Sequence, residues 1–405
     1  MAVTRRQFLT GLAGTGAAIA LGACSSGDHD VSLHPTTTQT SSAGAVSGGG
    51  DGTLVVVSLY GGNDGLDTVI PAADPVYRST RGELARTEAE VLDLGEGMGF
   101  HPALTQLKRE WDAQRVAVVQ GVGFSDLDRS HFHCMDVWQS AGEADMSTGW
   151  LGRWLDHGPR DPFRAISVGD SLPLLLQGAK ATGSVIPVEE TPLPNPTIAE
   201  RFATMSAGIE GPPLLVAAAQ AGTDMLAVDK RVSTIRDAAR SNDDDPVEPV
   251  GLAAQLALVA SLIEGGLPTR VYSAQMGGFD THADEKGTRD RLMVALDAGV
   301  GPFLRRMADR PVTVLVYSEF GRRVAMNGSA GTDHGRAGPV LVCGSQVKAG
   351  FHGDTPSLTN LDEGDLRPGI DFRSVYGAVL EGVLGVDPSD VISNANRYPA
   401  LTNLF

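Results

Sequence analysis

The sequence predicts an α/β fold built on a mostly parallel, doubly wound sheet with helices on both faces. Short runs rich in Val recur along the chain, and each is closed by Gly or an acid. Their apolar character is continuous rather than alternating, which suits strands that are covered on both faces. Amphipathic helical patterns separate these runs. Strand and helix in repetition is typical of a doubly wound sheet.

Six of the runs are expected to be strands of this sheet. They begin near Thr53, Arg115, Arg164, Thr269, Pro311 and Pro339. Three helical patterns between and after them are "HPALTQLKREWDAQ", "DRLMVALDAGVGPFLRRMAD" and "DFRSVYGAVLEGVLG". The first carries Pro in its first turn, and the last ends on the Gly that commonly stops a helix.

The stretch from about 189 to 251 differs from the rest. Loop-like segments rich in Pro and acids flank a long helical pattern. We interpret it as a helical insertion or cap over the sheet. The acidic run "NDDDP" is expected to be a solvated loop, with a cation site as the minor alternative.

The first residues indicate export. "TRRQFL" has paired arginines before an apolar, Gly- and Ala-rich stretch, as in a twin-arginine signal over residues 1–23. "LGAC" looks like the lipobox of bacterial lipoproteins, with Cys24 lipidated; the alternative is an ordinary signal with a chance Cys. Residues 24–52, rich in Ser, Thr and Gly, predict a disordered tether. The folded domain is expected over 53–405.

Charge and cysteines exclude several classes. The formal net charge of −17 makes the chain a poor candidate for binding nucleic acid. Beyond Cys24 it has only Cys134 and Cys343, too few for a disulfide scaffold, although one bridge stays open. Cys-pair zinc spacing is absent from the sequence.

Acids and histidines collect just after the predicted strands, where open α/β sheets bind their ligands. Four of the nine histidines lie in these tails. The candidates after the first, second, fourth and fifth strands are Asn63, Asp64 and Asp67; Ser130, His131 and His133; Asp280 and His282; and Glu319, Asp333 and His334. Two of these residues have a purely structural alternative. Asp64 could cap a turn, and Glu319 could pair with a neighbouring arginine.

Carboxylates with imidazoles and no thiolates predict one or two divalent ions, Zn²⁺, Mn²⁺, Mg²⁺ or Ca²⁺. In "FDTH", Asp280 and His282 would point the same way on an extended segment and could hold one ion. The adjacent Asp333 and His334 suit two ions, or one ion and a substrate. Two ions would clamp both oxygens of a displacement at phosphorus or sulfur.

Ser130 precedes the amphipathic stretch "SHFHCMDVWQSAG", so it is expected at a helix N-terminus. Capping that helix is the commoner role of such a Ser. The functional alternative is a nucleophile assisted by a metal and by the helix dipole.

Several ordered motifs resemble the bacterial domain of unknown function 1501 family. They are "LYGGNDGLDTVIP", "RSHFHCMDVWQSAG", "GGFDTHADE", "SEFGRRVAMNGSAGTDHGRAGP", "VKAGFHGD" and "DFRSVYGAVLEGVLG". That family is grouped with the alkaline phosphatase-like superfamily of phosphatases, sulfatases and phosphomutases. The resemblance implies that Asp64 is the first-strand metal ligand and Ser130 the nucleophile. It also implies that Asp280 and His282 serve one metal site, joined by Glu319 or by Asp333 and His334.

The function expected from these observations is an exported, lipid-anchored metal-dependent hydrolase of a phosphate or sulfate ester. Its ester would belong to a small molecule or an envelope polymer. The catalytic candidates are Ser130, Arg129 and His131, and Arg129, Arg322 and Arg336 could hold the anionic group. The alternative is a metal-stabilised binding lipoprotein of the cell envelope that turns nothing over.

Overall fold

The computed structural model describes residues 50–125, 127–142, 146–190, 196–240 and 250–405. The predicted signal, Cys24 and nearly all of the tether lie outside the described residues, as does the "NDDDP" run. None of the described helices is both long enough and apolar enough to span a bilayer. Cys134 and Cys343 are both buried and free, so they do not form a bridge.

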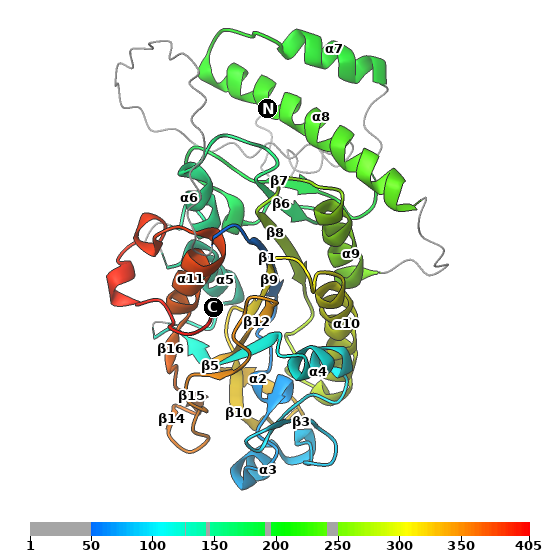
Figure 1. The fold of residues 1–405 in the computed structure, drawn as a ribbon. Coiled ribbons are helices and arrows are strands. Elements are labelled where there is room, and N and C mark those ends of the chain that lie inside the picture. The colour runs from blue at the N-terminus through cyan, green and yellow to red at the C-terminus, as the bar shows by residue number, and fades with distance from the viewer. Residues whose placement is uncertain (1–49, 126, 143–145, 191–195, 241–249) are drawn as a thin grey trace, which may run out of the picture. The chain divides into compact units, whose positions relative to one another are not determined.

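The core of the fold is a nine-stranded sheet (Figure 1). Its order is β13 (Gly350–His352), β5 (Val116–Gly123), β12 (Gly338–Gly344), β9 (Val312–Ser318), β1 (Thr53–Leu59), β8 (Val271–Met276), β6 (Ala165–Val168) and β7 (Ser184–Ile186), and β16 (Ile370–Asp371) also pairs with β5. All six predicted runs are strands of this sheet. Every pairing is parallel except those of β12 with β5 and β9, so the mostly parallel sheet is confirmed.

Helices cover both faces of the sheet, as the continuous apolar strands predict. Val55 and Val57 of β1 pack into a core with α4 (Thr105–Asp112), α9 (Gly251–Glu264) and α10 (Glu285–Arg306). Leu54 and Val56 point the other way, into a core with α5 (His131–Ser140), α6 (Trp150–Asp156) and α11 (Phe372–Val379). All four side chains are fully buried. Figure 1 shows the two helical layers on opposite sides of the strands.

The remaining elements are small and lie mainly at one end of the sheet. They are α2 (Gly65–Thr68), α3 (Pro75–Arg81), β2 (Val69–Ile70), β3 (Leu92–Gly95), β4 (Met98–Phe100), β10 (Arg322–Met326), β11 (Thr332–His334), β14 (Leu361–Asp362) and β15 (Asp365–Leu366). β10 pairs with β11, and β14 with β15, as short antiparallel hairpins.

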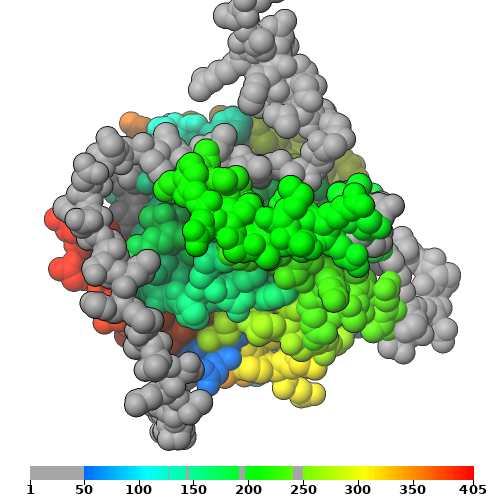
Figure 2. All heavy atoms as spheres, turned by 90° about the horizontal axis from the view of Figure 1, so that it is seen from above, coloured from blue at the N-terminus to red at the C-terminus, as the bar shows by residue number. Residues whose placement is uncertain are grey.

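The predicted insertion is helical. It contains α7 (Pro196–Ser206) and the long α8 (Pro213–Arg240), which packs against α7 and α9. Figure 2 shows the pair, in bright green, spread across one face of the domain.

The reversed direction of β12 positions the candidate site. Because β12 runs against its neighbours, it begins at the edge where β9 and β5 end. The β10–β11 hairpin spans the interval between β9 and β12, so it carries Asp333 and His334 back to that edge. This resolves why the pair follows Glu319 only after fourteen residues in the sequence.

Candidate metal centre

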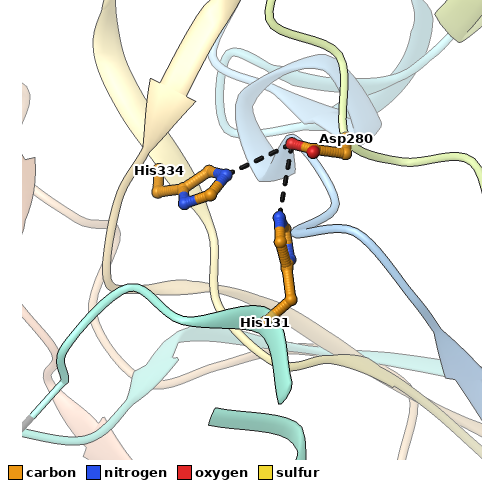
Figure 3. Close-up of side chains that lie close together, drawn as sticks. All are labelled: His131, Asp280 and His334. Atoms are coloured by element: carbon orange, nitrogen blue, oxygen red, sulfur yellow. Dashed lines mark hydrogen bonds and ion pairs between the residues drawn. The ribbon is translucent and has the colours of Figure 1, made fainter. Parts of the chain in front are cut away.

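Three side chains from separate segments meet at the carboxyl edge of the sheet. They are His131 at the start of α5, Asp280 in the loop after β8, and His334 at the end of β11. One ligand atom from each lies within 4.8 Å of the other two. Figure 3 shows both imidazole rings directed at the carboxylate of Asp280.

One carboxylate oxygen is the centre of the group. Oδ1 of Asp280 lies 3.3 Å from Nε2 of His131 and 3.2 Å from Nε2 of His334. Nε2 of His282 is also near, 3.0 Å from the same oxygen. The structure therefore brings together three of the candidates from the sequence with His131, which the sequence suggested as a catalytic rather than a ligating residue.

The other ring nitrogen of each ligand is held by an acceptor. Nδ1 of His131 lies 2.7 Å from Oε1 of Glu319, and Nδ1 of His334 lies 2.9 Å from the carbonyl oxygen of Arg129. A carboxylate and a carbonyl can only accept, so each Nδ1 carries the hydrogen. Both Nε2 lone pairs then face Asp280, the arrangement that outer partners impose on metal-binding histidines.

His282 has a different environment. Its Nε2 lies 2.9 Å from Nε2 of His334, a hydrogen-bond separation. Because Nε2 of His334 carries no hydrogen, the hydrogen of this bond is on Nε2 of His282, which donates it to His334. The Nδ1 of His282 lies 3.5 Å from Asp333, so this ring stands between the carboxylates of Asp280 and Asp333.

The charges suit a cation. Burial alone would raise the pKa of Asp280, but the hydrogen bond and the positive charge of Arg322 hold it at about 2. Burial lowers the pKa of His334, which keeps its imidazole neutral at pH 7. The hydrogen bond to Glu319 raises the pKa of His131 above the ordinary value, so a proton competes with an ion there.

Local packing fixes these positions. A Cβ on Gly61 would lie 2.5 Å from the nitrogen of Asp280, and the φ of Gly61 is +116°, so only glycine allows this approach. Gly61 also donates a 2.8 Å hydrogen bond to Glu319. The buried ring of Phe320 lies 4.9 Å from the ring of His131 and 4.8 Å from that of His334. The "GG" after the first strand thus permits close packing.

The residues present fit one divalent ion. Nε2 of His131 is buried and has no hydrogen bond among the described residues, as expected of an atom reserved for a metal. Two imidazoles and a carboxylate suit Zn²⁺ or Mn²⁺, whereas Mg²⁺ and Ca²⁺ prefer oxygen alone. Among the residues that the structure describes, this is the one group of three acids or histidines whose ligand atoms lie within 4.8 Å of one another.

Two predicted ligands have other partners, which argues against a second ion. Asp64 is not grouped with the histidines. It is 1% exposed, accepts from the backbone of Leu66 as the cap of α2, and pairs through both oxygens with the equally buried Arg81. Glu319 is fully buried and accepts from His131, Gly61 and Ser318, so it orients a ligand.

The other predicted site residues are placed as follows. Oγ of Ser130 accepts a 3.4 Å hydrogen bond from the backbone of His133, which is the capping role. Arg322 is fully buried and donates to Asp280 and to the carbonyls of Gly61, Gly62, Phe279 and Thr332, so it forms the floor of the site and is not open to a substrate. Arg129 and Arg336 both pair with Asp365.

The roles of Phe320, Arg322 and Asp365 could not be found from the sequence. Phe320 is an apolar residue directly after a predicted strand run, and Asp365 lies in a loop-like stretch with no nearby motif. The burial of Arg322 depends on four carbonyls that the fold collects from three separate segments. A single sequence carries no signal of such long-range convergence.

Fold and site together define an α/β protein with a histidine-rich candidate metal centre at the carboxyl edge of a mostly parallel sheet. The chain belongs to the DUF1501 family, described as a protein of unknown function, whose pattern matches residues 125–365. The resemblance seen in the sequence motifs is thereby confirmed. A search of the curated proteins gave no match.

Solved structures show only distant similarity. A protein in the alkaline phosphatase superfamily from Vibrio parahaemolyticus is 10% identical, with a TM-score of 0.39 over 85% of this chain and 70% of that chain. Ps i-CgsB is 9% identical, with a TM-score of 0.39 over 87% and 76% of the two chains. BT1596, a 2-O GAG sulfatase, is 10% identical, with a TM-score of 0.29 over 74% and 65%.

Proposed function

We propose that this protein is a metal-dependent hydrolase of a phosphate or sulfate ester, with one Zn²⁺ or Mn²⁺ held by His131, Asp280 and His334. The convergence of two Nε2 lone pairs on Asp280, each fixed by an acceptor at Nδ1, carries the proposal. Three protein ligands leave a coordination position open, as catalytic sites require. The ion would act as a Lewis acid on an oxygen of the ester.

His282 is assigned the proton transfer. It carries a hydrogen on Nε2, and Asp333 faces its Nδ1. Its side chain is 45% exposed, so a bound ester can reach it. As an imidazolium between the carboxylates of Asp280 and Asp333, His282 would give its Nε2 proton to the leaving oxygen as the bond from phosphorus or sulfur to that oxygen breaks, and would be left as a neutral imidazole.

Ser130 is the proposed nucleophile. It stands at the N-terminus of α5, directly before the ligand His131, where the helix dipole favours negative charge on its oxygen. Its hydroxyl would release its proton to solvent while its oxygen forms a bond to phosphorus or sulfur, and the leaving group would depart with the proton from His282. Water would then cleave that bond and release phosphate or sulfate.

One observation favours the alternative of a binding protein without turnover. Oγ of Ser130 already caps α5 by accepting from the backbone of His133. A protein that used the metal centre only for stability or recognition would need no more from this residue.

One experiment separates the hydrolase from the binding protein. The metal-loaded protein and its Ser130→Asn variant are both assayed with phosphate and sulfate esters. Asn caps a helix as well as Ser, so the variant keeps the fold. The hydrolase predicts a loss of at least about 1000-fold in kcat. Metal binding without turnover of any ester in the unaltered protein supports the binding protein instead.

We further propose that the protein is exported by the twin-arginine machinery. A lipid on Cys24 would anchor it to a membrane, on the outer side of the cytoplasmic membrane or in the periplasm. The motifs in residues 1–24 support this. The proposed substrate is a small-molecule or envelope-polymer ester, and the negative charge makes nucleic acid a poor candidate as a partner.

A further inference from the structure

We propose that Asp365 is the positioning residue of the metal centre: its one buried carboxylate ties the loop before His131 to the β10–β11 hairpin, which carries His334 and the Arg322 that contacts Asp280. The inference rests on the metal centre of the proposed function. It does not depend on which ester is hydrolysed.

Asp365 is fully buried at the start of β15 and pairs with three arginines. Its Oδ2 lies 2.7 Å from Nη2 of Arg129 and 3.3 Å from Nε of Arg336, and its Oδ1 lies 3.3 Å from Nε of Arg323. The three guanidinium groups are partly exposed, with side-chain exposures of 31%, 19% and 35%. A single buried acid therefore anchors three cations.

Each arginine is next to a member of the site in the sequence. Arg129 lies two residues before His131, and Arg336 lies two residues after His334. Arg323 follows Arg322, whose guanidinium donates a 2.8 Å hydrogen bond to Asp280. Arg323 and Arg336 lie on the two sides of the β10–β11 hairpin, whose strands already pair with each other, whereas Arg129 comes from the loop after β5. Asp365 therefore joins that loop to the hairpin.

The tie to Arg129 acts on a ligand directly. Arg129 has φ of +63°, a conformation that residues with a Cβ rarely adopt. In that conformation its carbonyl oxygen accepts from Nδ1 of His334 at 2.9 Å. The pair with Asp365 holds the side chain of Arg129, and thereby stabilises a backbone geometry that decides which nitrogen of His334 is free.

The test uses the full-length protein and its Asp365→Asn variant. Zn²⁺ affinity is measured by competition with a chromogenic chelator. Loss of an outer partner of a metal ligand typically weakens binding by about 10- to 100-fold, and we expect that range. Asp371→Asn is the matched control, because Asp371 also holds an arginine, Arg373, through two 2.7 Å hydrogen bonds but lies in β16 as the N-cap of α11, a role that Asn can also fill.

A second variant guards against a general loss of folding. Arg129→Met removes the side-chain pairs of residue 129 with Asp365 and Glu363, keeps its backbone carbonyl, and leaves Asp365 paired with Arg323 and Arg336. We expect it to reproduce most of the loss of affinity. Affinity within twofold of the unaltered protein in both variants would overturn the proposal.

A metal-free readout separates this inference from the proposed function. In the apo protein labelled with ¹⁵N-histidine, at about pH 8 where imidazole is neutral, His334 should carry its hydrogen on Nδ1. In Asp365→Asn and Arg129→Met a mixture of both tautomers is expected, while Asp371→Asn keeps the original one. An unchanged tautomer in both variants overturns the inference, even if the unaltered protein binds no metal and the proposed function fails.

Discussion

Glu319 accepts a 2.7 Å hydrogen bond from Nδ1 of His131, and this bond leaves Nε2 of the ring facing Asp280. Glu319 lies directly after β9 and His131 opens α5, so the bond joins the end of a strand to the start of a helix at the edge of the sheet. Glu319, which the sequence marked as a candidate metal ligand, thus orients the ring of another candidate ligand, His131.

Replacing Glu319 by Gln should weaken metal binding by about 10- to 100-fold, because the neutral amide oxygen accepts from Nδ1 of His131 without the negative charge that makes Nε2 a stronger ligand. Titration of the apo protein with Zn²⁺ measures the change. Glu264→Gln, at a more exposed pair with Arg306, is the control and should leave the affinity unaltered. An equal effect of the two variants would contradict an orienting role for Glu319.

Metal affinity should fall as the pH drops through the raised pKa of His131, because a proton then occupies Nε2. Since this pKa lies above the ordinary value of 6.5, binding near neutral pH should release protons, seen by calorimetry in buffers of different ionisation enthalpy. Affinity that stays constant from about pH 8 to 6 would contradict His131 as a ligand.

The same shift has the opposite sign for the stability of the metal-free protein. The folded state binds the proton of His131 more tightly than the unfolded chain does. The contribution to stability is therefore fully present below pH 6.5 and is lost as the pH rises through the raised pKa. Urea denaturation of the apo protein across this range, with Glu319→Gln as reference, measures it.

Asp64→Asn distinguishes this site from the ligand set implied by the family resemblance. The change leaves the guanidinium of Arg81 buried without its charge partner, which typically costs about 3–5 kcal/mol of the free energy of unfolding. Metal content should stay at the level of the unaltered protein wherever the variant is folded. Lost metal with unchanged stability would show that Asp64 is a ligand after all.

Glu285→Gln should stabilise the protein at pH 8. Glu285 is 1% exposed at the start of α10, and burial, with the nearby charge of Asp64, raises its pKa from 4.5 to about 7. The folded state therefore holds this proton more tightly, and its stability falls as the pH rises from 4.5 through 7. Removing the charge should restore up to about 3 kcal/mol at pH 8 and almost nothing near pH 4.

Chemical denaturation at both pH values checks this result, with the exposed Glu381→Gln as the control. A gain of the same size at pH 4 and pH 8 would assign the effect to packing rather than to charge.

The sequence predicted the sheet and the edge at which the chemistry collects, because buried strands leave continuous apolar runs and their ends leave acids and histidines. It did not predict the direction of β12, since an apolar run reads the same in both directions. It also could not separate ligands from their supports. Glu319 and Asp280 look alike as acids after a strand, and only the fold shows that one holds a ring nitrogen while three rings surround the other.

The roles of Asp64 and Asp365 depend on contacts between distant segments. Asp64 pairs with Arg81 from α3, and Asp365 pairs with arginines from two other parts of the chain. Both acids are fixed by guanidinium groups whose positions the local sequence does not determine. The pattern of acids and histidines at the strand ends thus located the site, whereas the role of each residue in it depends on tertiary contacts.

The most direct test of the central claim is the metal content of the purified protein after dialysis against Zn²⁺, Mn²⁺, Mg²⁺, Ca²⁺ and Fe²⁺ in turn. Fe²⁺ is included because two imidazoles and a carboxylate also suit it. We predict one equivalent of Zn²⁺ or Mn²⁺ in the unaltered protein and none in the Asp280→Asn, His334→Ala double variant. No bound metal from any of the five, or equal metal in the folded double variant, would contradict the centre.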